Sequence, residues 1–292
     1  MYNILDIYRS ALEIKVQGKT ELIIPEITGY SDLQAVADET GILIHCQGGA
    51  KYAPSEKKYR TIGILGGLGP YATADIFEKI IRNTPAAMDQ EHIKIVIINN
   101  PQIPDRTMAL RGKGITPAVA MLAGIEGLER AKADFVIIPC NTAHAFVNEL
   151  KPYIKIPILS MIEETVQYVI ANHPDCKNIG LLATTGTVES GVYAEYCEKA
   201  GLNLLTPSRT TQENLVMRAI YGPSGIKAGN QSELPAQMLN EAAAGLIKAG
   251  AGVVILGCTE IPLVIGESDL PVPAIDPTEI LAKAAVKMAM VR

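Results

Sequence analysis

The sequence contains no tryptophan, and aromatic residues of all kinds make up only 5% of its 292 residues. A basic surface with stacked aromatic side chains is the usual sign of a nucleic-acid-binding protein. This chain has few aromatic residues, and its net charge at pH 7 is -5. We therefore expect no nucleic-acid partner.

Long apolar runs are also missing. The sequence has no stretch of about 18 apolar residues, the length that a membrane-spanning helix requires. Its first residues include Asp6 and do not follow a signal-peptide pattern. With hydrophobic residues at 48% and charged residues at 20%, the composition is typical of a globular protein. We expect a cytoplasmic protein without a membrane partner.

The cysteines also show no pairing pattern. The five cysteines, at positions 46, 140, 176, 197 and 258, are odd in number and have no CxxC spacing. Neither a disulfide framework nor a zinc site is indicated. Cysteines 176 and 197 do not end a predicted strand, so we interpret them as structural. At His45 and Cys46, we predict the end of a buried strand rather than a metal site.

From Thr61 onward, short β-branched apolar runs alternate with longer stretches of helical periodicity. Buried parallel strands are predicted at residues 61–67, 94–100, 134–140, 156–161, 178–184, 252–258 and 272–276. Helices are predicted at residues 72–83, 115–133, 163–173 and 234–250. This alternation predicts an α/β fold whose sheets are mainly parallel and flanked by helices.

The predicted strands recur as a set. Ile62 and Ile179 begin similar strands 117 positions apart, and Cys140 and Cys258 end two later strands 118 positions apart. Buried strands can look alike by chance, but the matched strand ends favour two halves of similar fold. We predict two pseudo-symmetric lobes that face each other across a cleft. The two lobes comprise residues 61–163 plus 278–292 and residues 164–277.

Residues 1–60 stand outside this repeat. We predict a helix at residues 2–18, a strand at 21–27, a helix–strand pair at 31–46 and a charged linker at 52–60. This small α/β extension carries no chemical motif, and its role is unknown.

Cys140 and Cys258 each lie at the carboxyl end of a predicted strand, where parallel sheets line their clefts. Each could be core filler, a metal ligand or a reactive thiol. Two symmetric lobes would place one thiol on each side of a bound molecule, as inversion of a carbon stereocentre requires. The pKa of a free thiol, about 8.5, makes the acid and the base form accessible, and a helix predicted after each cysteine would lower it.

The residues that follow the two cysteines are candidates for substrate binding. Asn141, Thr142 and Thr259 could cap helices or hydrogen-bond to a substrate, and these roles are compatible. His144, one helical turn after Cys140, invites a Cys–His or metal interpretation. No acidic or cysteine cluster accompanies it, so we predict a packing or capping role.

Three loops also bear on the site. Residues 66–70, GGLGP, lack the spacing of a dinucleotide fingerprint and predict a tight turn that brings backbone amides to a small anion. Arg106, in the proline-containing loop 99–107, could clamp a carboxylate, pair with Asp105 or be solvated. Lys227, in the loop 220–230, could be carried over the site by a mobile lid or be solvated.

Taken together, these segments resemble the aspartate/glutamate racemase superfamily and, within it, the cofactor-independent aspartate racemases. The resemblance covers about Thr61 to Arg292. It rests on the ordered motifs GILGGLGPYATADIFEKI, NNPQIPDRT, DFVIIPCNTAHAF, IPILSMIEE, GLLATTGTVESGVY, KAGN, VILGCTE and DPTE. The extension of about 60 residues is a departure from the compact members of this family.

The resemblance implies a two-lobed α/β fold and interconversion of L- and D-aspartate by two-base proton transfer, with no metal, pyridoxal phosphate or other cofactor. It places the acid/base thiols at Cys140 and Cys258 and makes Arg106 and Lys227 binders of substrate carboxylates. The predicted substrate-binding set is Arg106, Asn141, Thr142, Ala143, Lys227 and Thr259. By analogy with the family, we expect a homodimer.

Three alternatives remain open. Glutamate racemases usually carry an Asp-Ser pair after the first strand, where this chain has GGLGP, but another acidic amino acid could be the substrate. Decarboxylases and maleate isomerases have similar folds, although a decarboxylase typically needs one cysteine. A non-catalytic two-lobed binding protein would need no thiol pair.

Overall fold

The computed structural model describes residues 21–24, 31–38, 41–47 and 59–291. The chain divides into two compact units, Met1–Lys58 and Tyr59–Arg292. In the first unit, the described residues form a three-stranded antiparallel sheet in the order β1 (Glu21–Ile24), β2 (Ser31–Asp38) and β3 (Gly41–Gln47).

The helix predicted to begin at residue 31 is wrong, because residues 31–38 form strand β2. Hydrogen bonding to β1 on one side and β3 on the other outweighs the local helical preference of this segment. The described residues of the extension are therefore all β. The predicted helix at 2–18 and most of the predicted linker, residues 52–58, lie outside the described residues.

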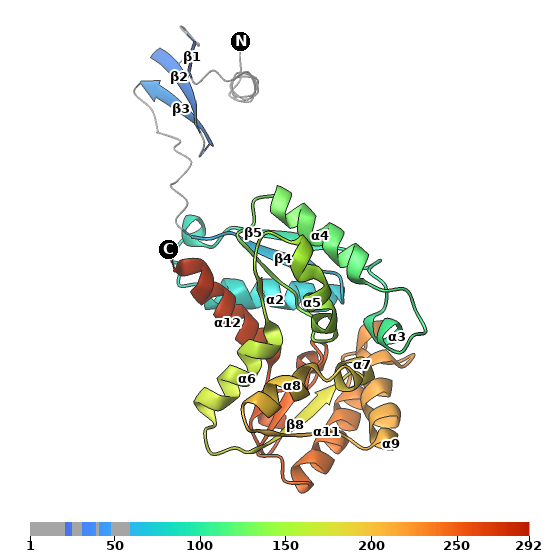
Figure 1. Ribbon diagram of the computed structural model, residues 1–292. Coiled ribbons are helices and arrows are strands. Elements are labelled where there is room, and N and C mark those ends of the chain that lie inside the picture. Colours follow the sequence, from blue (N-terminus) through green and yellow to red (C-terminus); the bar gives the residue numbers. More distant parts are fainter. Residues whose placement is uncertain (1–20, 25–30, 39–40, 48–58, 292) are drawn as a thin grey trace. The chain divides into compact units, whose positions relative to one another are not determined.

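The second unit contains two parallel four-stranded sheets (Figure 1). The first has the order β5-β4-β6-β7, with β4 (Ile62–Gly66), β5 (Ile95–Asn99), β6 (Phe135–Ile137) and β7 (Ile158–Leu159). The second has the order β11-β10-β8-β9, with β8 (Asn178–Ala183), β9 (Asn203–Leu205), β10 (Val253–Gly257) and β11 (Ala274–Ile275).

The two sheets share one topology. Taken from its other edge, the second sheet runs β9-β8-β10-β11, which is the order β5-β4-β6-β7 of the first. The expectation of two pseudo-symmetric α/β lobes is confirmed. All seven predicted strands are present, and the unpredicted β9 is a three-residue edge strand that is only partly buried.

Helices flank both sheets (Figure 1). The four predicted helices correspond to α2 (Pro70–Asn83), α4 (Ala118–Arg130), α6 (Met161–Asn172) and α11 (Glu233–Lys248). The other α-helices are α3 (Arg106–Leu110), α5 (Val147–Leu150), α7 (Thr185–Glu189), α8 (Val192–Lys199), α9 (Arg209–Thr211), α10 (Arg218–Tyr221) and α12 (Pro277–Met290). In the described part of the chain, no helix has the length and hydrophobicity needed to span a bilayer.

Two helices each follow the last strand of one sheet but pack on the other sheet. Helix α12 follows the last strand of the second sheet, yet its Leu281 and Ala285 pack with Ile62 and Phe135 of the first. Helix α6 follows the last strand of the first sheet, and its inner side packs against β8 and β10 of the second. The chain therefore crosses twice between the sheets, once before α6 and once before α12.

Candidate active site

Cys140 lies beyond the carboxyl end of β6 and is almost fully buried. The helix predicted to follow it is present, but its first residues, Thr142–Phe146, are 3₁₀-helix, and α5 follows directly at Val147–Leu150. The backbone here is held by His144, whose Nδ1 lies 2.9 Å from the carbonyl oxygen of Cys140. The Met161 amide donates to Nε2 of the same ring at 3.1 Å, so Nδ1 carries the proton and donates.

His144 is therefore a structural residue, as its sequence context predicted. Burial lowers the pKa of its imidazole to about 4, against smaller opposing effects of backbone hydrogen bonds at Cys140 and Asn141. The ring is neutral at physiological pH, which suits its one donor and one acceptor contact.

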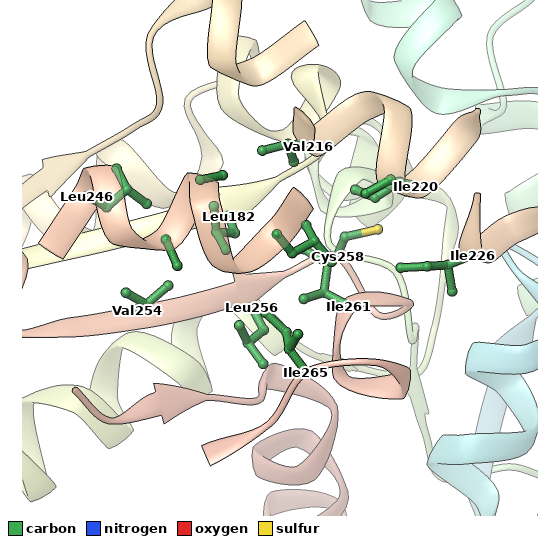
Figure 2. Close-up of a cluster of buried hydrophobic side chains, with 14 of the residues drawn as sticks. Leu182, Val216, Ile220, Ile226, Leu246, Val254, Leu256, Cys258, Ile261 and Ile265 are labelled. Atoms are coloured by element: carbon green, nitrogen blue, oxygen red, sulfur yellow. The ribbon is translucent and has the colours of Figure 1, made fainter. Parts of the chain in front are cut away.

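Cys258 occupies the equivalent place beyond β10. The turn after it, Ile261–Leu263, is again 3₁₀ rather than α-helical. Figure 2 shows the side chain among the apolar residues of the second lobe, next to Ile220, Ile226 and Ile261. Burial first, and then the negative charge of Glu260, raise the pKa of this thiol well above its usual value, while Lys227 opposes them.

Asn141 does not cap a helix, which corrects one interpretation of the sequence. Its side chain forms no capping hydrogen bond, and its Oδ1 instead accepts from the Tyr193 hydroxyl at 2.6 Å. This bond fixes the orientation of the amide. The buried Nδ2 group has no hydrogen-bond partner among the residues that the structure describes. An N–H donor is thus free at the site.

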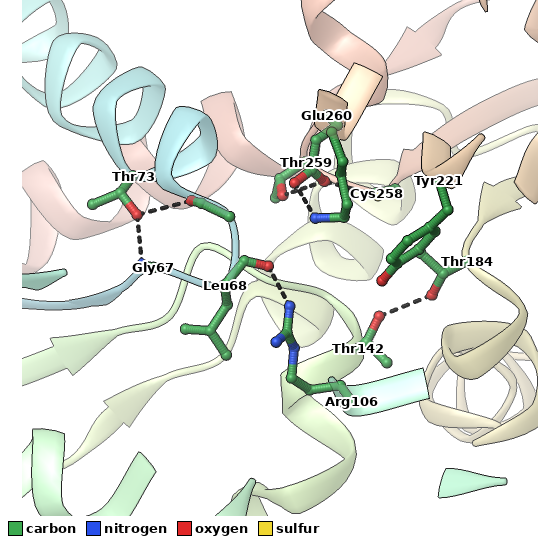
Figure 3. A network of polar contacts seen from close by, with 12 residues as sticks. Gly67, Leu68, Thr73, Arg106, Thr142, Thr184, Tyr221, Cys258, Thr259 and Glu260 are labelled. Atoms are coloured by element: carbon green, nitrogen blue, oxygen red, sulfur yellow. Dashed lines mark hydrogen bonds and ion pairs between the residues drawn. The ribbon is translucent and has the colours of Figure 1, made fainter. Parts of the chain in front are cut away.

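Thr142 belongs to a buried ring of three hydroxyl groups. Its Oγ1 lies 2.9 Å from Oγ1 of Thr184 and 2.8 Å from Oγ1 of Thr187, and the latter two are 3.1 Å apart. Thr142 comes from the first lobe and the other two from the start of α7 in the second. The ring joins the lobes at the edge of the site, and Figure 3 shows its contact between Thr142 and Thr184.

Arg106 is the first residue of α3, not part of an extended loop, and it is buried rather than solvated or paired with Asp105. Its guanidinium donates to the carbonyl oxygens of Ile103, Pro104 and Leu68, the last at 2.6 Å (Figure 3). Burial would lower the pKa of Arg106, but attraction to Cys140, Tyr221 and Asp105 outweighs it, so the pKa lies above its usual value. Within the described residues, its buried Nε has no hydrogen-bond partner.

Lys227 is in a 3₁₀ turn, Ile226–Ala228, and forms an ion pair with Oε1 of Glu260. It is not the solvated lysine that its local sequence suggested. Burial would lower the pKa of Lys227, but Glu260 and Cys258 outweigh this effect and raise it. Its Nζ also lies 5.5 Å from the ring centre of Tyr221.

The ion pair packs against the start of α2. A Cβ atom at Gly69 would lie 2.5 Å from Oε1 of Glu260 and 3.4 Å from Nζ of Lys227, so a larger residue there would force the Glu260 carboxylate to move. In the adjacent turn, Gly67 has a φ of 91° and its amide donates to Thr73 Oγ1. The turn predicted from GGLGP is present, while its anion-binding role remains a prediction.

These side chains line one small cavity, whose volume in this structure is about 10 Å³. It is lined by Leu68, Arg106, Cys140, Asn141, Thr142, Thr184, Tyr221, Lys227, Cys258, Thr259 and Glu260. Seven of the eight predicted site residues thus line it, and the eighth, Ala143, is fully buried in the core of the first lobe. Elsewhere in the described chain, no group of three or more His, Cys, Asp or Glu side chains could hold a metal ion.

Sequence reasoning missed Leu68, Thr184, Tyr221 and Glu260. Thr184 follows β8, at the same strand end as other site residues, so the strand-end rule could have found it. Glu260 stands next to a predicted site residue, but nothing in its spacing indicated that its side chain turns back to Cys258. Tyr221 enters from a helix distant in sequence, and its hydroxyl donates to Asp105 Oδ2 at 3.2 Å.

Comparison with known proteins identifies the family. The sequence model of the Asp/Glu/hydantoin racemases matches residues 65–285, which include both cysteines and every cavity-lining residue. The chain belongs to this family. It is an amino-acid racemase in the broad sense of the family, and an isomerase.

Individual relatives span the second unit. The Picrophilus torridus aspartate racemase structure is 33% identical, with a TM-score of 0.69, over 78% of this chain and 93% of that one. The broad specificity amino-acid racemase RacX of Bacillus subtilis is 28% identical over 77% of this chain and 96% of its own length. A glutamate racemase structure from Bacillus anthracis, 21% identical with a TM-score of 0.58, shows the shared fold.

Proposed function

We propose that the protein interconverts L- and D-aspartate by proton transfer between Cys140 and Cys258. The observation that carries this proposal is the cavity that both thiols line, each from the end of the equivalent strand of its own sheet. A molecule bound there would lie next to one thiol from each lobe. Binding alone would not require such a pair.

In the proposed reaction, the thiolate of one cysteine removes the proton from Cα, and the thiol of the other delivers a proton to the opposite face. The proton count is unchanged, and the two cysteines exchange protonation states in each turnover. Neither pyridoxal phosphate nor a metal ion takes part in this scheme.

The carbanion needs positive charge close by, because an α-proton beside a carboxylate is only weakly acidic. The pKa values of Arg106 and Lys227 both lie above their usual values, so both side chains stay protonated near neutral pH. We assign Arg106 to the side-chain carboxylate of aspartate and Lys227 to substrate carboxylate binding from the other lobe. The fork geometry of arginine suits a carboxylate.

The remaining site residues would orient the substrate. The free Nδ2 of Asn141 can donate to a carboxylate, and the hydroxyls of Thr142 and Thr259 can accept or donate hydrogen bonds. Ala143 can contribute only through its backbone, because its side chain is fully buried.

Aspartate is favoured as substrate by the similarity to an aspartate racemase at 33% identity. The similarity to a broad specificity racemase makes other amino acids the second candidate. A panel of amino acids, incubated in deuterated water without added pyridoxal phosphate, distinguishes them. Both enantiomers of aspartate should gain deuterium at Cα, and aspartate should react fastest. If no amino acid exchanges, the racemase proposal fails and a binding role is favoured.

The two thiols are tested by substitution. Cys140→Ser and Cys258→Ser should each lower racemisation by at least about a thousandfold, since a serine hydroxyl is a far weaker acid than a thiol. Cys176→Ser, which changes a cysteine outside the cavity, should retain activity. Full activity in either of the first two variants would remove that residue from the scheme. As further expectations, we propose a homodimer and a cytoplasmic location.

A further inference from the structure

Glu260 is an acidic side chain inside a cavity proposed to bind an acidic substrate. It is 3% exposed, and its carboxylate contacts three partners. Oε1 is paired with Nζ of Lys227, and Oε2 lies 3.0 Å from Sγ of Cys258 and 3.3 Å from Oγ1 of Thr259. Figure 3 shows Glu260 and Cys258 on the side of the site opposite Arg106.

The contact between Oε2 and Sγ has a chemical consequence. An ionised carboxylate can only accept a hydrogen bond, so the sulfur must carry the proton that is shared between them. A thiolate in this place would face a like charge at about 3 Å in a water-poor setting, which is strongly unfavourable. The geometry therefore stabilises Cys258 as a thiol, the proton-donating form.

The contact between Oε1 and Lys227 has a second consequence. Lys227 is the cation assigned above to a substrate carboxylate, yet it already holds a carboxylate from its own chain. A substrate carboxylate must therefore compete with Glu260 for this ammonium group. The start of α2 at Gly69 lies against the same oxygen, and its free amide dipoles favour negative charge there.

We propose that Glu260 is a catalytic carboxylate that keeps Cys258 protonated in the resting enzyme and occupies Lys227 until a substrate carboxylate displaces it. This proposal rests on the proposed function. The other charged or titratable groups that face the cavity are Cys140 after β6, Arg106 of α3 and Tyr221 of α10. Arg106 comes from the first lobe, and its positive charge attracts Cys140. The two cysteines therefore have opposite electrostatic surroundings, a guanidinium near Cys140 and a carboxylate next to Cys258.

The decisive variant is Glu260→Gln, which has the same size and no charge. Titration of the Cys258 Cβ signal by NMR, in protein labelled with ¹³C-cysteine and assigned with Cys258→Ser, reports the protonation of the thiol without requiring a reagent to enter the cavity. The midpoint should move down by at least about one pH unit, a tenfold change in the proton affinity of the sulfur. Glu267→Gln, which changes an exposed carboxylate nearby, should titrate like the parent.

Lys227→Met separates this effect from general loosening of the fold. Loss of the ammonium group should move the Cys258 midpoint up, because Glu260 then acts on the thiol alone. Loosening would move the midpoint of both variants toward that of a free thiol, in the same direction. A midpoint that does not fall in Glu260→Gln, or that moves the same way in both variants, overturns the proposal.

Binding and kinetics provide the second readout. Succinate, a dicarboxylate with no amino group and no stereocentre, should bind Glu260→Gln about tenfold more tightly than the parent, because Lys227 is no longer occupied. For aspartate, KM should fall while kcat also falls, since the Cys258 thiol no longer has the Glu260 carboxylate as its hydrogen-bond acceptor. Weaker succinate binding would contradict the displacement step. If the parent racemises nothing, the proposed function fails, whereas the thiol titration and succinate binding still test Glu260.

Discussion

Asn141 illustrates how a single side chain in the site depends on a residue that does not line the cavity. Tyr193 is fully buried on α8, burial raises the pKa of its phenol, and its hydroxyl donates to Oδ1 of Asn141. Without this bond the amide could rotate and present its oxygen, not its N–H group, to a substrate carboxylate. The second lobe thus orients a binding group of the first.

We predict that Tyr193→Phe lowers kcat/KM for aspartate by about tenfold, with most of the change in KM, because the Asn141 donor is no longer oriented. The free energy of unfolding should fall by about 1–3 kcal/mol, since Oδ1 is left buried without a partner. Steady-state kinetics and urea unfolding measure the two effects. Tyr196→Phe, three residues along the same helix, should change neither; unchanged kinetics in Tyr193→Phe would contradict the orienting role.

Because His144 is buried, we predict that the free energy of unfolding decreases when the pH falls below neutral. In the unfolded chain its pKa is near 6.5, and burial lowers it to about 4 in the folded protein. Between these values the unfolded state binds more protons, so the free energy of unfolding falls as pH decreases from about 6.5 toward 4 and is unaffected by this residue above that window. The full effect is on the order of 3 kcal/mol.

The test is urea unfolding at pH 7 and pH 5. His144→Gln should be less stable than the parent at pH 7 but should lose less stability on going to pH 5. His92→Gln, outside the site, should keep the parent's pH dependence. Equal slopes in the parent and His144→Gln would contradict a neutral, buried imidazole.

Most residues of the site could be predicted because chain position and residue type coincide. A cysteine at a strand end, repeated in the second lobe, is visible in sequence; so is an arginine in a matched motif. Glu260 could not be predicted in this way, since its partner Lys227 is 33 residues away and the ion pair depends on the path of an intervening chain. Tyr193 is likewise visible only once the fold places its hydroxyl next to Asn141.

At the scale of elements, the strands were predictable because a parallel strand buried on both faces is a continuous apolar run. The turns after Cys140 and Cys258 were not. A helix was expected after each cysteine, but the pattern did not show that its first turn is 3₁₀. Strand β2 escaped prediction for a different reason, since its pairing partners, not its own sequence, determine its conformation.

Helices α2 and α12 are joined by a buried lysine. Nζ of Lys79 lies 2.6 Å from Oδ2 of Asp75 and 2.7 Å from Oδ2 of Asp276, the N-cap residue of α12. We predict that Lys79→Met lowers the free energy of unfolding by about 3 kcal/mol or more, because two carboxylates remain close together without a cation. Adding Asp75→Asn should restore part of the loss.

Urea unfolding of the single and double variants gives the coupling between the two residues. Lys283→Met removes an exposed lysine of α12 that is paired with Glu279 at 3.2 Å, and it should cost less than about 1 kcal/mol. If Lys79→Met were no more harmful than Lys283→Met, the buried ion pairs would not stabilise the junction of the two helices.

At the scale of the whole molecule, every residue that lines the cavity belongs to the unit Tyr59–Arg292. The Tyr59 side chain packs on the core of the first sheet, and the amide of Arg60 donates to the carbonyl oxygen of Ala289. We predict that a chain starting at Tyr59 folds and keeps at least about half of the racemase activity of the full chain. Circular dichroism and the deuterium-exchange assay measure both properties. An inactive but folded truncation would show that residues 1–58 are needed for catalysis.

The lobe boundaries, 61–163 plus 278–292 and 164–277, stay a proposal, in which residues 278–292 join the first lobe because α12 packs on the first sheet. The sequence repeat alone does not describe this arrangement completely. The repeat predicts two equivalent sheets, but it does not indicate which sheet each connecting helix covers.

The crossing of α12 has a consequence for how the protein is made. On a ribosome the first sheet leaves the exit tunnel early, yet Ile62, Ile64 and Phe135 are covered by residues near the carboxyl end of the chain. Until synthesis is finished, the part of that face that α2 does not cover stays exposed to solvent and to chaperones. A ribosome stalled before residue 277 should therefore hold a nascent chain whose first lobe is protease-sensitive, and release of the last helix should complete it.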